Sequence, residues 1–187
     1  IAGFTNIEDA KILLQWQSFV FLAAAVVVLW IGKKIYDWAM PFSVDNELTH
    51  ADNKALAVAY FGYLIAQGII VWYVLTSPGQ HELVKDLIAV GLWSLVGIVL
   101  LNVCRFVNDK VILGTFSNKK ELIEDRNIGV GAAQAGSYIG TALVLGAIVA
   151  GEQSDLASSL LGAGVFFALG QGAFVVFSLI YRKFAGY

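Results

Sequence analysis

The chain of 187 residues has 12 Lys and Arg residues against 14 Asp and Glu residues, a formal net charge of -2 at pH 7. This near-neutral balance, with its scattered basic residues, excludes the strongly basic surface of a nucleic-acid-binding protein. The chain is 58% hydrophobic and has a mean hydropathy of +0.74, more than the core of a soluble domain of this size needs. Composition therefore predicts a protein whose partner is the lipid bilayer.

Five stretches of the chain contain no Asp, Glu, Lys or Arg. A helix needs about 20 apolar residues to cross the hydrocarbon core of a bilayer, and each stretch is close to that length. Residues 19–29 are apolar on every side, whereas a helix of a soluble bundle alternates polar and apolar faces. We therefore expect an all-α, polytopic membrane protein with five transmembrane helices. The stretches are residues 12–32, 55–81, 87–104, 127–151 and 156–181.

The basic residues predict how the chain is oriented. All of them except Lys11 and Lys85 fall on one side of a five-span arrangement. Because cytoplasmic loops carry the excess of Lys and Arg, we expect the N-terminus outside and the C-terminus in the cytoplasm. The sequence begins at Ile1 with no basic region ahead of an apolar stretch, so any signal peptide would lie outside it.

The chain matches itself when it is shifted by 74 residues without a gap. Polar identities in both loop regions are harder to obtain by chance than apolar matches between membrane helices. The shift predicts two repeats, residues 7–76 and 81–150, that enter the membrane in the same direction, followed by an extra helix over 156–181. The identities include Glu8 with Glu82, Lys11 with Lys85, Ser43 with Ser117, Glu47 with Glu121, Asn53 with Asn127 and Gly62 with Gly136.

Each predicted repeat has an inner segment with the same motif. Glu47-Leu48 precedes Asn53, and Glu121-Leu122 precedes Asn127; each Asn opens a span with regularly spaced small residues. In these features, over approximately residues 10–150, the chain resembles the YjfL-like (DUF350) family of bacterial inner-membrane proteins of unknown function. The resemblance implies a bacterial inner-membrane location, and it offers no reaction to carry over. The span over 156–181 lies outside the four-helix pattern of that family.

The two asparagines of the motif have two interpretations. Asn53 and Asn127 stand at the first residues of their spans, where an Asn side chain accepts hydrogen bonds from unpaired backbone N–H groups and caps the helix. The functional alternative is that both, together with Glu47 and Glu121, line a polar vestibule.

Small residues at a spacing of four mark one face of the second and fourth spans. Such residues let helix backbones approach closely in a membrane. We predict that Gly62 and Ala66 in one span, and Gly136 and Gly140 in the other, are helix-packing residues. The fifth span is similarly rich in glycine, which favours packing against a neighbouring subunit.

The third span ends in a polar stripe. Asn102, Arg105 and Asp109 are spaced by three and four residues, so a regular helix places them on one face near the cytoplasmic end. Charged residues at such depth favour an ion pathway, a gate or a partner interface. In the alternative interpretation Arg105 reaches the lipid headgroups and pairs with Asp109.

The sequence contains no motif typical of an enzyme, a cofactor site or a metal site. The single Cys104 excludes an intramolecular disulfide and is expected to be a small apolar packing residue. The loops are too short for a catalytic domain, so we expect no enzymatic activity. The sequence favours a structural or complex-forming membrane subunit that assembles with copies of itself or with another membrane protein. The alternative is an oligomeric conduit for ions or small solutes.

Overall fold

The computed structural model describes residues 16–77, 82–112, 119–151 and 155–185. Within these ranges it is entirely helical, and five helices are long and apolar enough to cross a membrane. The predicted fold class, an all-α polytopic membrane protein, is confirmed. The five helices are α2 (Trp16–Ala39), α4 (Lys54–Thr76), α5 (Leu83–Val107), α6 (Ile128–Ala150) and α7 (Leu156–Ala185).

Three helices, α2, α5 and α7, extend several residues beyond the uncharged stretches that predicted them, whereas α4 and α6 do not. α2 continues through Lys33 and Asp37, whose side chains form an ion pair of 3.1 Å one helical turn apart. Residues four apart on a helix are neighbours, so the pair lets charged residues continue the helix at the membrane surface. The ends of the membrane helices are therefore set by such local pairs and by caps, in addition to hydropathy.

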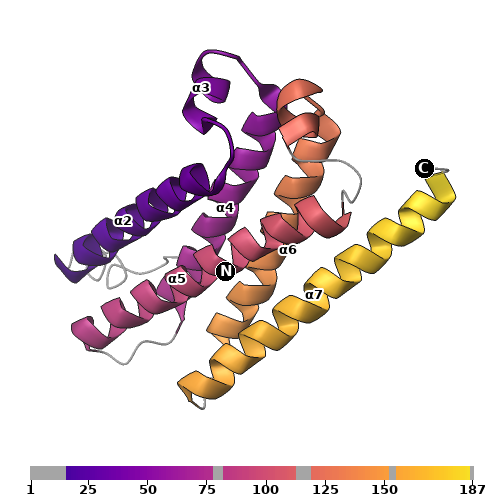
Figure 1. Ribbon diagram of the computed structural model, residues 1–187. Helices are drawn as coiled ribbons and strands as arrows, with labels where there is room; N and C mark the ends of the chain where they lie inside the picture. Colours follow the sequence, from indigo (N-terminus) through magenta and orange to yellow (C-terminus); the bar gives the residue numbers. More distant parts are fainter. Residues whose placement is uncertain (1–15, 78–81, 113–118, 152–154, 186–187) are drawn as a thin grey trace, which may run out of the picture.

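Three helices run in one direction and two in the other. α2, α5 and α7 ascend in Figure 1, while α4 and α6 descend. Both α2–α4 and α5–α6 therefore have the same up-and-down sense, as the predicted parallel repeat requires.

The centre of the molecule is the packed pair α4 and α6. Gly62 of α4 lies directly against Ala135 of α6, and Gly131 of α6 lies against the backbone of Ala55. A Cβ atom on either glycine would collide with the facing helix. Small residues thus let the two backbones approach closely, as is typical of membrane helices that lack a hydrophobic driving force.

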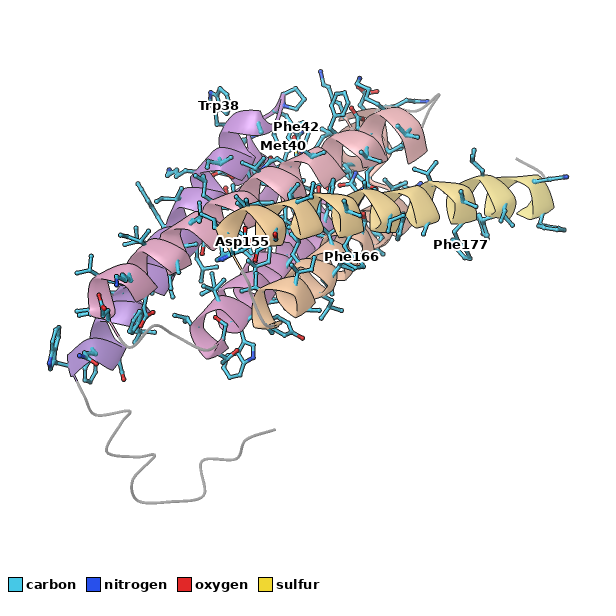
Figure 2. The ribbon with its side chains drawn as sticks, turned by 90° about the horizontal axis from the view of Figure 1, so that it is seen from below. Trp38, Met40, Phe42, Asp155, Phe166 and Phe177 are labelled. Carbon is cyan, nitrogen blue, oxygen red and sulfur yellow. The ribbon has the colours of Figure 1, made fainter. Side chains whose placement is uncertain are left out.

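The other helices lie around this pair. α5 contacts both central helices, with Trp93 and Leu101 buried in the core, and α2 lies beside α5. α7 packs on α6 through its first half, and its second half extends past the bundle, where Phe177 is 68% exposed (Figure 2).

Short helices precede α4 and α6 at one end of the molecule. α3 (Val44–Thr49) leads into α4, while α5 continues as the π-helix η1 (Asn108–Ile112), and the π-helix η2 (Lys120–Glu124) leads into α6. Asp52 and Arg126, which are 74 residues apart, both adopt a left-handed backbone with φ of 48°. The two inner segments thus make the same turn before an Asn and a membrane helix.

Candidate functional site

The inner segments hold their asparagines in the same way. Asn53 Oδ1 accepts from the backbone N–H of Leu56 at 3.0 Å, and Asn127 Oδ1 accepts from Gly129 at 3.0 Å and from Val130 at 3.3 Å. The predicted N-caps of both helices are therefore confirmed. Each cap satisfies backbone donors that the first turn of a helix leaves unpaired.

Each asparagine is also held by the glutamate of its own segment. Asn53 Nδ2 donates to Glu47 Oε2 at 3.1 Å, and Asn127 Nδ2 donates to Glu121 Oε2 at 3.0 Å. Asn53 Nδ2 makes a second bond of 2.8 Å to the carbonyl oxygen of Leu122, and only 1% of Asn53 is exposed, whereas Asn127 is exposed. The structure thus brings the two inner segments together at Asn53 and Leu122. That the two asparagines and the two glutamates line one polar vestibule stays a prediction.

A second group of polar side chains lies deeper, among the membrane helices. We call it the tyrosine cluster. Its rings pack in series: the Tyr36 and Tyr63 centroids are 4.5 Å apart, and those of Tyr63 and Tyr138 are 5.6 Å apart. All three tyrosines are fully buried. The cluster consists of Tyr36 of α2, Tyr63 of α4, Asn102 and Arg105 of α5, and Tyr138 of α6.

Tyr63 is the hydrogen-bonding centre of this cluster. Its hydroxyl donates to the carbonyl oxygen of Gly32 and accepts from Asn102 Nδ2 and Gln67 Nε2, each at 3.4 Å. Asn102 Nδ2 also donates to the carbonyl oxygen of Ile98 at 2.9 Å. One hydroxyl therefore links α2, α4 and α5 by contacts that are longer than typical hydrogen bonds, and therefore weak.

Several polar atoms of the cluster have no partner. They are Arg105 Nε, Asn102 Oδ1 and the hydroxyls of Tyr36 and Tyr138, all inaccessible to solvent. Arg105 contacts Met40 through Nη1, 3.5 Å from Sδ, and lies close enough to the three tyrosines to act on them electrostatically. Unpaired polar groups are costly in hydrocarbon, so the other contacts of the cluster must offset this cost.

Asp109 does not extend the stripe as predicted. It lies in the π-helix η1, and its carboxylate is 3.5 Å from Lys110 rather than paired with Arg105. The expected ion pair between Arg105 and Asp109 is therefore wrong, while Asn102 and Arg105 do share one region.

A third polar group joins α5, α6 and α7. Cys104 Sγ lies 2.9 Å from Ser137 Oγ, and Thr141 Oγ1 donates to the same sulfur at 3.5 Å. Ser137 Oγ donates to Asn108 Oδ1 at 3.2 Å, and Gln171 Nε2 donates to Thr141 Oγ1 at 2.9 Å. Cys104 is buried as expected, but its surroundings are polar rather than apolar. This group fastens α7 to the other helices.

Comparison with known proteins identifies the chain by its domain. A family model described as a Domain of Unknown Function matches residues 9–149. The chain belongs to the DUF350 family. No curated protein and no solved structure matches the chain. The DUF350 match covers the inner segments and the tyrosine cluster, while α7 begins at Leu156, beyond the matched residues.

The four predicted packing residues fall in two environments. Within the DUF350 domain, Gly62 and Ala66 are buried at the α4–α6 contact. Gly136 and Gly140 are exposed, and a Cβ atom on either would meet nothing within 4 Å. The close packing expected inside the chain is thus present at the first pair and absent at the second, whose contact with a partner stays a prediction.

Sequence reasoning missed most of the polar residues that the DUF350 domain buries. Three of these, Tyr36, Tyr63 and Tyr138, were not predicted as site residues because tyrosine is common at membrane surfaces, although Tyr63 and Tyr138 lie well inside their spans. Ser137 and Thr141 stand four residues apart on α6, a spacing that predicts a shared polar face. Across the described ranges, no group of three His, Cys, Asp or Glu residues is placed to hold a metal ion.

Proposed function

We propose that the protein is a structural or complex-forming subunit of the bacterial inner membrane, which assembles with copies of itself or with another membrane protein. The observation that supports this most is the outward face of α6. Ala132 and Gly136 are exposed there, while the exposed Gly140 borders the space between α6 and α7. A face of small residues forms a surface without large side chains, against which another helix can pack closely.

The corresponding helix α4 provides an internal comparison. Its outward residues are large, with Val58 36%, Phe61 64% and Ile65 40% exposed. Large apolar side chains suit contact with lipid tails, which are themselves flexible and apolar. α4 and α6 therefore correspond to each other in the 74-residue shift but have different outward surfaces. Of these two surfaces, that of α6 is the one that suits a protein partner.

The mass of the purified protein tests this proposal. We would extract the full chain with its native lipids, and measure the mass of the assembly and the identity of every chain in it. We expect more than one chain per particle, and we expect Gly136→Leu to reduce the assembly to single chains because the new side chain fills the contact face. Gly68→Leu is the matched control, since Gly68 of α4 also faces open space. If the unsubstituted protein and both variants each gave particles of a single chain, the proposal would be overturned.

A second candidate function is a conduit for ions or small solutes. It is supported by the tyrosine cluster, because a membrane protein rarely keeps an arginine and unpaired hydroxyls inside the bundle without a use for them. Under this proposal Arg105 and Asn102 lie near the cytoplasmic mouth. Ion flux into liposomes tests it: we expect flux with the unsubstituted chain and its loss with Arg105→Met. Liposomes that remain tight to cations and anions in both cases would exclude the conduit.

The proposed orientation places the N-terminus outside and the inner segments in the cytoplasm. It is supported by the basic residues that flank the inner segments. With Cys104 replaced by Ala, a cysteine at Glu124 and one at Thr76 would be exposed on opposite sides. A membrane-impermeant maleimide added to intact cells is expected to label only the Thr76→Cys variant; labelling of Glu124→Cys instead would reverse the topology.

A further inference from the structure

The face that α4 uses to pack on α6 occurs a second time in the chain, on α6 itself. On α4 this docking face consists of Ala55, Ala59 and Gly62, all of which are buried. The shift of 74 residues carries it onto Gly129, Ala133 and Gly136, all of which are exposed. A Cβ atom on Gly136 would meet nothing within 4 Å. The docking face of the first repeat is therefore covered, while that of the second repeat is exposed.

Inside the chain, the docking face of α4 packs on a receiving face of the second repeat. Gly62 lies against Ala135, and Ala55 lies against Gly131. Gly62 does not meet its own counterpart, because the shift relates Ala135 to Phe61. The two repeats are thus joined through two different faces, and such a contact is heterologous. Each repeat therefore keeps one of the two faces unused.

The unused receiving face lies on the first repeat. The reverse shift carries Gly131 and Ala135 onto Ala57 and Phe61 of α4. Phe61 is 64% exposed, and Ala57 is half-buried. One chain therefore offers a docking face on α6 and the matching receiving face on α4, which are the two halves of the contact already present between its repeats.

We propose that the docking face of α6 packs on the receiving face of α4 in a second copy of this chain, repeating between copies the contact that joins the two repeats. This inference rests on the proposed function and names the partner surface. Gly129 lies against Ala57 of the second copy, and Gly136 lies against its Phe61. Because two different faces meet, further copies add head to tail, and they form a ring where the rotation closes.

The asparagines of the inner segments support the same arrangement. An amide nitrogen carries two N–H donors, and Asn53 Nδ2 uses one for its own glutamate and one for the Leu122 carbonyl oxygen. Asn127 is exposed, and among the described residues its Nδ2 donates to Glu121 alone. The counterpart of Leu122 is Leu48. In the contact between copies, the second N–H of Asn127 donates to the Leu48 carbonyl oxygen of the second copy.

The two faces are complementary in size. Phe61 stands where the internal contact has the methyl group of Ala135, and its ring needs more room. Ala133 and Gly136 leave that room because they have little or no side chain. Phe61 faces lipid in a single chain, and in the contact its ring packs on α6 instead. The ring also holds the two helices further apart beyond this level, so Gly68 stays outside the contact.

Disulfide crosslinking between two forms of the full chain tests this contact. Both forms carry Cys104→Ala; one also carries Gly136→Cys, the other carries Phe61→Cys, and their affinity tags differ. A disulfide needs Cα atoms within about 7 Å of each other, so it reports direct contact of the two faces. We expect oxidation of membranes that contain both forms to give a dimer with both tags. Each form by itself is expected to give no dimer, because neither face meets itself.

Val99→Cys is the matched control for Phe61→Cys. Val99 of α5 is 52% exposed and lies at a similar depth from the inner segments, but it belongs to neither face. We expect no dimer when it is combined with Gly136→Cys. A dimer as abundant as that with Phe61→Cys would mean that chains collide at random, and would overturn the proposal.

The mass of the particles separates this proposal from the proposed function. A dimer formed by Gly136→Cys alone would mean that the outward face of α6 meets itself, and would overturn the head-to-tail contact. The absence of every crosslink in particles of more than one chain would overturn it as well. Assembly itself stands in both cases, whereas particles of a single chain would overturn the proposed function together with this contact.

Discussion

The side-chain amide of Asn53 donates a 2.8 Å hydrogen bond to the main-chain carbonyl of Leu122, 69 residues further along the chain. Asn53 is 1% exposed and Leu122 is fully buried, so the bond is shielded from water. It joins the start of α4 to the segment that precedes α6. Asn127 matches Asn53 in sequence, in capping and in the bond to its own glutamate, but its amide makes no bond to the other inner segment among the described residues.

This difference predicts unequal effects of removing the two asparagines. Asn127→Ala removes a helix cap and is expected to lower the free energy of unfolding by about 1 kcal/mol. Asn53→Ala removes a cap and also leaves the buried Leu122 carbonyl without its donor, which adds about 1–3 kcal/mol. Unfolding by SDS titration in mixed micelles measures both. Equal losses for the two variants would mean that the Leu122 bond contributes nothing to stability.

The contact between α4 and α6 predicts a strong effect of one added methyl group. In Gly62→Ala the new Cβ would lie 2.5 Å from Ala135 Cα, so the helices must separate. We expect a loss of about 1–3 kcal/mol, which is typical of overpacking. Gly68→Ala is the control, because Gly68 has nothing within 4 Å of an added Cβ and gains helix propensity of about 0.5–1 kcal/mol. If the Gly62→Ala and Gly68→Ala proteins had the same melting temperature, the close packing of α4 against α6 would be contradicted.

The left-handed residues of the inner segments predict a stabilising substitution. Arg126 has φ of 48°, a conformation that costs an L-residue about 1–2 kcal/mol and costs glycine nothing. Arg126→Gly is therefore expected to raise the free energy of unfolding by about 1 kcal/mol. Asp52→Gly should gain less, because aspartate tolerates this conformation better. The melting temperatures of both variants measure these gains in stability. A lower melting temperature for Arg126→Gly than for the unsubstituted protein would contradict the left-handed backbone conformation of Arg126.

The tyrosine cluster predicts that a charge can be removed with a gain in stability. Arg105 Nε is buried without a partner, and in the described parts of the chain no carboxylate forms an ion pair with this side chain. Methionine has a similar length and no polar group, so Arg105→Met is expected to stabilise the protein by about 1–2 kcal/mol. Lys34→Met, at an exposed position of α2, should change stability little. Destabilisation by Arg105→Met would show that the guanidinium has partners that hold it in place.

The membrane helices and their caps could be predicted from the sequence because each depends on a local rule. Uncharged length predicts a span, and an asparagine at its first residue predicts a cap, so α4 and α6 begin one residue after Asn53 and Asn127. The shift of 74 residues pointed to the shared inner motif for the same reason. The error at Asp109 has a different cause: its carboxylate lies 3.5 Å from the neighbouring Lys110 and not at Arg105, and spacing alone does not decide between two basic residues within reach.

The polar groups inside the bundle could not be predicted, because they depend on which faces of the helices meet. Tyr63 and Asn102 lie on different helices, 39 residues apart, and only the tertiary arrangement brings them to 3.4 Å. Gly62 and Gly136 match each other in sequence but face different neighbours: one meets a helix of the same chain, and the other faces outward. A pattern of small residues predicts close packing, but does not say which surface will be covered.

The bond between Gln171 and Thr141 makes the DUF350 part of this chain depend on the helix that follows it. Ser137 and Thr141 are buried on the side of α6 where α5, η1 and α7 meet it. Without α7, the Thr141 hydroxyl on this side of α6 would face lipid, where an unpaired polar group is costly. Docking of α7 on α6 therefore closes a part of the domain's interior that α2, α4, α5 and α6 leave open.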